Sequence, residues 1–177
     1  MPDQPCPLDG IRVLDLTTTI AGPYCSRLLA DMGAAVIKVE GPEGDMTRER
    51  PPLREGASTS YGQLNAGKRS IALDLKADPG DDRDSTIARL VARADVFVQN
   101  FAPGAAERLG LGAAELRERH PRLITCSISG YGPDGPYRDA KAYDLLIQSE
   151  AGLVSVTGTQ DEPAKAGIPA ADIGAAK

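Results

Sequence analysis

Residues 11–42 read IRVLDLTTTIAGPYCSRLLADMGAAVIKVEGP, and this stretch decides the fold. The run 11–16 is short and rich in large apolar residues, which is typical of a buried strand. The segment 24–32 carries apolar residues at helical spacing and stops before Gly33. The run 35–40 reads as a second strand. A strand, a helix and a strand within about 30 residues predict a right-handed βαβ unit, so the sheet begins with parallel pairing.

The rest of the chain continues this alternation. Strand-like runs follow at residues 71–75, 96–98 and 123–128, and helical patterns follow at 87–94, 113–120 and 143–156. Residues 43–68 show little periodicity and read as one long loop. We therefore expect an α/β fold, Rossmann-like and doubly wound, with a mainly parallel sheet. Ligands of such sheets bind beyond the carboxyl ends of the strands, where loops start at Thr17, Gln99 and Ser129.

Composition limits the classes of function. The chain has 177 residues, of which 41% are hydrophobic and 25% charged, as in one globular domain. Its formal net charge of −5 argues against nucleic acid and anionic membranes as partners. The chain contains neither an apolar run of membrane-spanning length nor a signal-peptide pattern at its start, which predicts a cytoplasmic protein. Three widely spaced cysteines and a single histidine predict free thiols and no metal site.

Two phosphate-binding patterns are incomplete. Residues 62–69, GQLNAGKR, resemble a P-loop, but Arg69 stands where Ser or Thr should bind magnesium. Residues 110–115, GLGAAE, lack the third glycine of a dinucleotide fingerprint. The remaining candidates are the carboxylates Asp15, Glu40, Asp45 and Asp172 and the cations Lys38, Arg48, Lys68, Lys76, Arg108 and Lys141. Taken singly, each reads more readily as a surface charge or a structural cap.

A series of short motifs carries a family resemblance. In chain order they are LDGIRVLDL (8–16), AGP (21–23), LADMGA (29–34), VIKVE (36–40), GDMTR (44–48), LNAGKRS (64–70), LDLK (73–76), NFAPG (100–104), SGYG (129–132) and ADI (171–173). Together they resemble the class III CoA-transferases, the family of formyl-CoA transferase and carnitine CoA-transferase. The resemblance covers essentially the whole chain, although each motif alone is weak.

The resemblance implies a chemistry centred on Asp172. This residue aligns with the family's catalytic aspartate, which attacks the thioester of an acyl-CoA donor. A mixed anhydride and then an aspartyl-CoA thioester would follow, and a carboxylic acid acceptor would take over the CoA. CoA and acyl-CoA would be substrates, with no tightly bound cofactor and no metal. From the residues alone, Asp172 fits equally well as the N-cap of a helix starting at Ile173.

The resemblance also implies a CoA site. Its members would be Arg108 and Lys141 at the phosphates, Leu73, Asn100 and Phe101 at the adenine with Lys76 nearby, and Ile20 and Ala21 along the pantetheine path toward Tyr143. Ala102 departs from the family pattern, in which an Arg or Lys is common at this position. One cation is therefore missing, and we expect weaker CoA binding.

Alternatives remain at this point. The related α-methylacyl-CoA racemases carry a His before the Asp that corresponds to Asp144, but Tyr143 stands there, and a tyrosyl hydroxyl is a poor base at neutral pH. Transfer is therefore favoured over racemisation.

Family members are much longer and have a second domain and interlocked homodimers. Residues 1–177 would thus form the N-terminal part of the large, CoA-binding domain, with the second domain absent. A fragment, a truncated reading frame, a split enzyme with a complementing polypeptide, and a non-catalytic CoA-binding remnant all stay open. Such a part should expose apolar surface.

Overall fold

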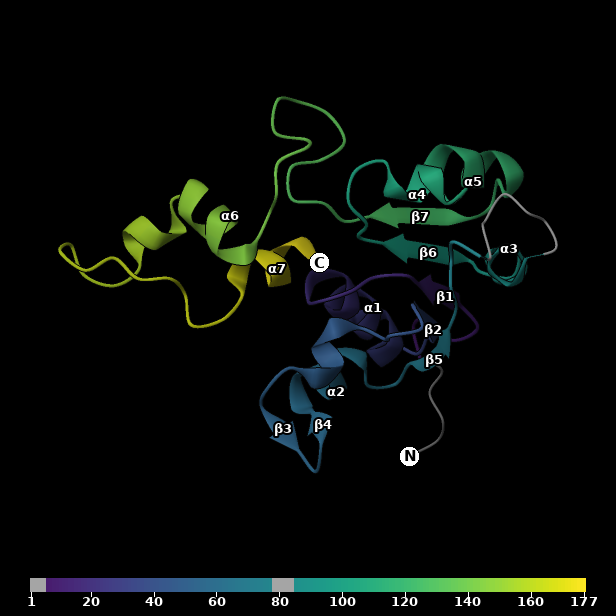
Figure 1. Cartoon of the computed structure of the whole chain (residues 1–177), viewed down its shortest axis with the longest axis horizontal. Coiled ribbons are helices and arrows are strands. Elements are labelled where there is room, and N and C mark those ends of the chain that lie inside the picture. Colours follow the sequence, from purple (N-terminus) through teal and green to yellow (C-terminus); the bar gives the residue numbers. More distant parts are fainter. Residues whose placement is uncertain (1–5, 78–84) are drawn as a thin grey trace.

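A five-stranded parallel sheet forms the body of the protein. A computed structural model of the chain describes residues 6–77 and 85–177. The sheet has the order β5-β2-β1-β6-β7, and every neighbouring pair is parallel (Figure 1). The strands are β1 (Arg12–Asp15), β2 (Ala35–Glu40), β5 (Arg69–Ala72), β6 (Val96–Gln99) and β7 (Ile124–Ser127). The predicted α/β parallel fold is confirmed.

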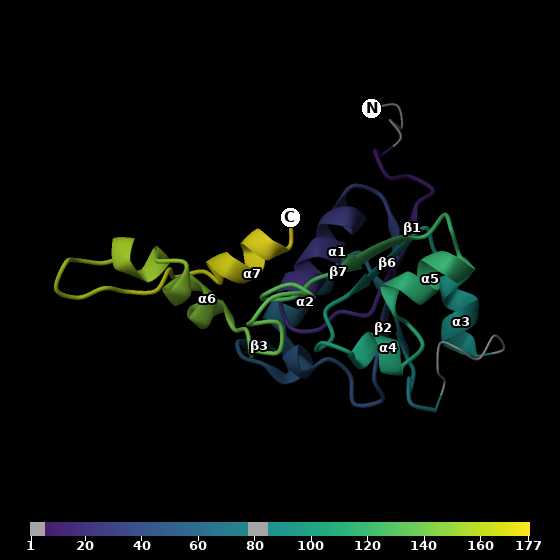
Figure 2. The ribbon, with the colours of Figure 1, turned by 90° about the horizontal axis from the view of Figure 1, so that it is seen from above.

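Helices lie on both faces of the sheet (Figure 2). They are α1 (Ala21–Asp31), α2 (Thr59–Asn65), α3 (Thr86–Val91), α4 (Ala105–Arg108), α5 (Ala113–Arg119), α6 (Asp144–Glu150) and α7 (Ala170–Ala175), with 3-10 turns η1 (Met46–Glu49) and η2 (Leu153–Val156). Because side chains alternate along a strand, Val13 packs toward α1 and Leu14 toward α3 and α5. The larger core, on the second side, centres on Phe97 and Ile87, which are 1% and 0% exposed.

Three predicted elements differ in detail. The strand predicted at 71–75 instead covers 69–72, because Arg69 to Ala72 pair with residues 37–40 of β2. The predicted long loop 43–68 holds η1, α2 and a small hairpin of β3 (Leu53–Arg54) and β4 (Ala57–Ser58). The helix predicted over 143–156 ends early, since Gly152 has φ of 79° and separates α6 from η2.

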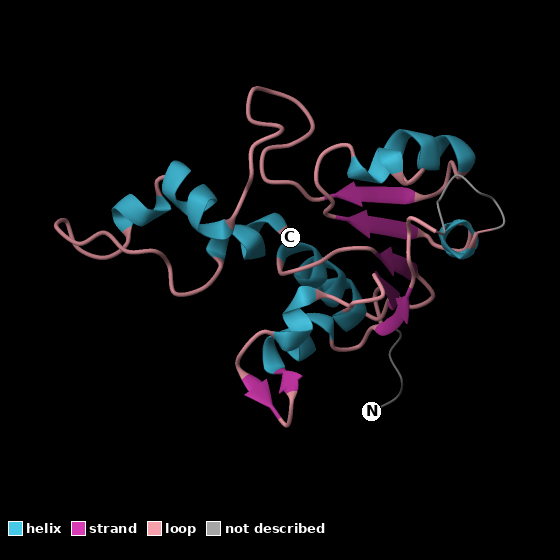
Figure 3. Cartoon of the chain, in the orientation of Figure 1, coloured by secondary structure: helices cyan, strands magenta, loops and turns pink. Residues whose placement is uncertain are grey.

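The segment from α6 to α7 forms an arm beside the sheet. A long loop leads from β7 to α6, and the arm then returns through α7, which packs against α1 (Figures 1 and 3). Apolar side chains are exposed along the arm, as expected from the sequence: Tyr143, Leu145, Leu146, Val156 and Ile168. Within the described ranges, no helix combines the length and apolar character that crossing a bilayer requires.

Candidate active site

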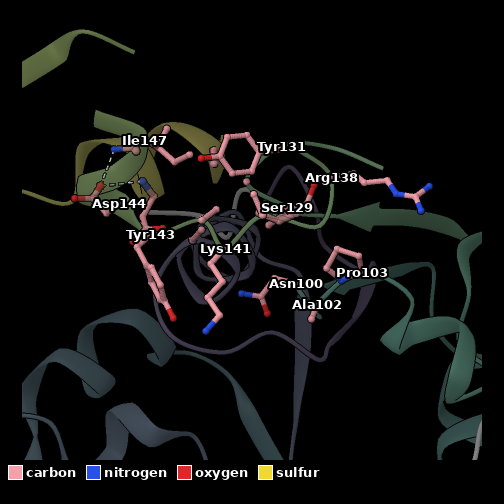
Figure 4. Close-up of a pocket in the computed structure, with 18 of the residues that line it drawn as sticks. Asn100, Ala102, Pro103, Ser129, Tyr131, Arg138, Lys141, Tyr143, Asp144 and Ile147 are labelled. Carbon is pink, nitrogen blue, oxygen red and sulfur yellow. Dashed lines mark hydrogen bonds between the residues drawn. The ribbon is translucent and has the colours of Figure 1, made fainter. Parts of the chain in front are cut away.

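A cavity of about 550 Å³ lies at the carboxyl ends of β6 and β7, where the topology predicts a ligand site. Its wall comes from the start of α1, the loop 100–103, the loop 128–143, the first turn of α6 and the helix α7. Figure 4 shows side chains from the loops 100–103 and 128–143 and from α6 around the cavity. The arm and the sheet therefore build the cavity together.

Six of the ten predicted site residues line this cavity. They are Ala21, Asn100, Phe101, Lys141, Tyr143 and Asp172. In the view of Figure 4, the side chains of Lys141 and Tyr143 extend from the segment that leads into α6, with Lys141 directed toward Asn100. The fold thus brings together residues that are up to 151 positions apart in the chain, from Ala21 to Asp172.

The other four lie outside the cavity wall. Ile20 is the residue immediately before α1, next to Ala21. Arg108 ends α4 and is exposed. Its guanidinium lies close to Gly104, because a Cβ placed on that glycine would be 3.0 Å from Arg108 Nη1. Leu73 follows β5 and packs against the larger core. Lys76 is exposed, and its backbone N–H donates a hydrogen bond to Asp74 Oδ1. The apolar side chain of Leu73 is therefore partly used by the core.

Asp172 sits in the first turn of α7 and is half-buried. Burial raises the pKa of its carboxyl above the ordinary range, and the nearby charge of Asp144 raises it further. The alternative role of N-cap is wrong, because α7 starts at Ala170 and Pro169 takes the cap position. A carboxylate inside a first helical turn, on a cavity wall, is free to face a ligand.

Asn100 is hydrogen-bonded to the loop that leads from β1 to α1, whose first residue, Ala21, lines the cavity. Its Oδ1 accepts a hydrogen bond from the Thr18 N–H, and its Nδ2 donates to the Thr18 carbonyl, both at 2.9 Å. The next residue, Thr19, has φ of 73°, a left-handed conformation that costs a β-branched residue free energy. Strained backbone conformations of this kind cluster at binding sites. Here the two hydrogen bonds from the Asn100 amide to Thr18 help to fix the conformation of the loop.

A buried ion pair is hydrogen-bonded to the same loop, which connects β1 to α1. Lys38 on β2 and Asp45 are both fully buried, with Nζ and Oδ2 3.1 Å apart. Nζ also donates to the carbonyl of Thr17 at 2.6 Å. Asp45 Oδ2 accepts no hydrogen bond from the described residues, so the ammonium group is what compensates its charge.

A second buried pair lies next to it. Lys68 Nζ is 3.0 Å from Asp15 Oδ2, and it also donates to the carbonyl of Pro23 and to Asn65 Oδ1. Asp15 additionally accepts from Ser26 Oγ at 2.6 Å. Lys68 thereby ties β1, the start of α1 and the end of α2 into one unit, which is a structural role and not that of a surface charge.

A third pair joins β2 to η1 and α2. Arg48 donates two hydrogen bonds of 2.7 Å to the Glu40 carboxylate, and Tyr61 donates another of 2.8 Å. Burial opposes ionisation of Glu40, but the hydrogen bonds from Arg48, the Asp45 N–H and Tyr61 outweigh it and lower its pKa to about 2. Most of the charged candidates from the sequence therefore hold the scaffold under the cavity.

Two residues near Asp172 were not among the predicted site residues. Asp144 opens α6, and Gln148 lies one turn later and is 1% exposed. The two residues are four positions apart and therefore lie on one face of the helix, which is the feature of the sequence that could have indicated a shared role. Their partners lie at least 18 residues further along the chain. Among residues 6–77 and 85–177, no three His, Cys, Asp or Glu side chains gather as a metal site.

The fold and the cavity define a doubly wound α/β protein with an acidic side chain on its cavity wall. The sequence profile of CoA-transferase family III matches residues 8–177, and the chain belongs to this family. It is 46% identical over 182 residues to a succinate–glutarate CoA-transferase of Agrobacterium fabrum, covering 98% of this chain and 45% of that protein. It is 45% identical over 165 residues to a succinyl-CoA:mesaconate CoA-transferase of Haloarcula hispanica, covering 88% and 41%.

Solved structures agree with this assignment. The crystal structure of a CAIB/BAIF family protein from Brucella suis matches with a TM-score of 0.87 and 44% identity, over 96% of this chain and 46% of that one. The family resemblance seen in the sequence is confirmed. The chain spans less than half the length of the relatives it matches.

Proposed function

We propose that this chain is part of the large, CoA-binding domain of a CoA-transferase, with Asp172 as the nucleophile. The observation that carries the proposal is that Asp172 shares one cavity wall with Ala21, Asn100, Phe101, Lys141 and Tyr143. A carboxylate, a cation and apolar surface at one opening suit a thioester whose carrier has phosphates and an adenine. Arg108 would add a second cation beside the loop 100–104.

The reaction is a chain of acyl transfers. The Asp172 carboxylate attacks the thioester carbonyl carbon, the C–S bond breaks, and CoA leaves as thiolate with a mixed anhydride left behind. The thiolate then attacks the aspartyl carbonyl, which releases the donor acid and forms an aspartyl-CoA thioester. The acceptor carboxylate attacks the aspartyl carbonyl of this thioester, the C–S bond breaks, and a second mixed anhydride and CoA thiolate form. The thiolate then attacks the acceptor's acyl carbon, which gives the acceptor's CoA thioester with the Asp172 carboxylate as leaving group. Asp172 is regenerated as carboxylate, and no electrons are exchanged with a redox partner.

The acids are proposed to be dicarboxylic. The names of the two relatives refer to succinate, glutarate and mesaconate, all of which carry two carboxyl groups. Arg138 lines the cavity besides Lys141, and its guanidinium suits the second carboxylate of such an acid. A homodimer or a complementing polypeptide, and a cytoplasmic location, stay predictions.

Trapping tests the proposed nucleophile. The chain is incubated with succinyl-CoA and then with hydroxylamine, and its peptides are measured by mass spectrometry. We expect a hydroxamate on the peptide that contains Asp172, because both the anhydride and the thioester of its carboxyl react with hydroxylamine. Unmodified Asp172 in a folded chain that binds CoA would support a CoA-binding remnant in place of a transferase.

Restoring the missing cation should tighten CoA binding. Ala102 is exposed on the cavity wall, so Ala102→Lys is expected to lower the Kd for CoA about 3-fold to 5-fold, or about 0.7–1 kcal/mol. Calorimetry at two salt concentrations measures this, and the gain should shrink at high salt. Ala92→Lys, at the end of α3, adds the same charge away from the cavity and serves as the control. Equal or weaker binding by Ala102→Lys would contradict the proposed phosphate side.

A further inference from the structure

The first turn of α7 is held by a carboxylate from another helix. Asp144 Oδ1 accepts hydrogen bonds from the backbone N–H of Ala171 at 2.9 Å and from that of Asp172 at 3.3 Å. These N–H groups have no partner within their own helix. Asp144 thus acts as the cap that Pro169 cannot provide, since no side chain at the cap position of α7 accepts a hydrogen bond.

Gln148 fixes Asp144 from the other side. Gln148 Nε2 donates to Asp144 Oδ2 at 2.6 Å and also lies 3.4 Å from the carbonyl of Ile168, while its Oε1 accepts from the Ala166 N–H at 3.0 Å. This amide is 1% exposed, so both of its ends are used inside the protein.

Other charged and titratable side chains line the same cavity. The loop 128–143 contributes Arg138, Asp139 and Lys141, together with the hydroxyls of Tyr131 and Tyr143. From α1, only Ala21 lines the cavity, and α6 contributes Asp144. Arg138 is already paired with Asp139 at 3.2 Å. Asp144 accepts a hydrogen bond from the backbone N–H of Asp172, and it is the charge that raises the pKa of the Asp172 carboxyl.

We infer that Asp144 is a positioning residue for Asp172: it anchors the first turn of α7, so that the Asp172 carboxylate faces the cavity beside a second negative charge. This inference rests on the proposed function, in which Asp172 is the nucleophile. The neighbouring charge disfavours ionisation of Asp172, in agreement with the raised pKa of that carboxyl. The same charge makes the Asp172 carboxylate more basic and hence a better attacking group once it is ionised.

Two variants separate the anchoring from the charge. Asp144→Asn keeps an oxygen that can accept from the α7 N–H groups, since Asn is a good helix cap, but it removes the charge. Asp144→Ala removes both. Asp161→Asn, on the exposed loop 157–168, is a matched control for loss of one negative charge.

The Asp172 carboxyl is followed directly by NMR. In the full chain with ¹³Cγ-labelled aspartate, the signal that disappears in Asp172→Asn identifies Asp172, and its midpoint is measured by pH titration. We expect Asp144→Asn to move this midpoint to lower pH by about half a pH unit or more, and Asp161→Asn to leave it in place. Amide exchange at Ala171 should accelerate at least about tenfold in Asp144→Ala and far less in Asp144→Asn.

These readouts need no acyl transfer, so they fail independently of the proposed function. A midpoint that stays or rises in Asp144→Asn, or Ala171 protection that survives in Asp144→Ala, overturns the positioning role even where the Asp172 hydroxamate forms. A lowered midpoint without any hydroxamate would leave the positioning of Asp172 intact and sink the transferase proposal.

Discussion

Asp172→Ala should abolish the covalent adduct and lower CoA transfer by a factor of about 1,000 or more, because each step of the proposed route passes through this carboxyl group. CoA affinity should change less than about twofold, since the side chains proposed to bind CoA belong to other segments of the chain than α7. The measurement pairs a transfer assay with mass spectrometry of the intact chain. Asp161→Ala is the control, because Asp161 is exposed and outside the cavity.

The same assay distinguishes the alternatives left by the sequence. An adduct that persists in Asp172→Ala would place the nucleophile elsewhere. Exchange of the α-proton of a methylacyl-CoA without any acyl transfer would favour a racemase. CoA binding without adduct or exchange, in the unsubstituted chain, would identify a CoA-binding remnant.

Lys38→Met should lower the free energy of unfolding by about 3–5 kcal/mol, because it leaves Asp45 as an uncompensated buried carboxylate. It also removes the hydrogen bond to the Thr17 carbonyl, which lies under the loop that enters the cavity. Urea unfolding measures the loss. Lys76→Met makes the same change at an exposed position and should cost less than about 0.5 kcal/mol.

A second variant and a pH series test the cause of that loss. Burial opposes ionisation of Asp45, but hydrogen bonds from Thr47 and the charge of Lys38 outweigh it and lower the pKa of Asp45. Its stabilising contribution is therefore present above the unfolded pKa and is lost as the pH falls toward the folded one. Adding Asp45→Asn to Lys38→Met should recover stability, and the deficit of Lys38→Met should shrink in acid. A deficit independent of pH and of residue 45 would show that lost packing, not charge, is responsible.

The sequence predicted best those elements whose pattern of apolar residues lies within the element itself. The strand 35–40 was predicted with its observed bounds, because a run of apolar residues buried in a parallel sheet is visible in the sequence itself. The end of the strand near residue 71 was not, since pairing with β2 decides its register. The break at Gly152 was missed because apolar residues continue past it at helical spacing, and the positive φ is set by tertiary packing.

The site divides in the same way. The resemblance to a family pointed to Asp172, and six of the predicted residues share its cavity. Asp144 and Gln148 were not found, because their bonds reach residues 166–172 and depend on how the arm folds back. Nor could the burial of Lys38 and Asp45 be read from charge patterns, in which they resemble surface residues.

The cavity wall is built from two parts of the chain, the sheet and the arm. Asn100 and Phe101 follow β6 and are fixed by the core, whereas Asp172 belongs to α7, which returns to the body at α1. Loop 128–143 is the tether between them, and it is built from glycine-rich turns and not from paired strands. A small rotation of the arm about this loop would change the distance between Asp172, the proposed nucleophile, and the loop 100–103, while every strand pair stayed intact.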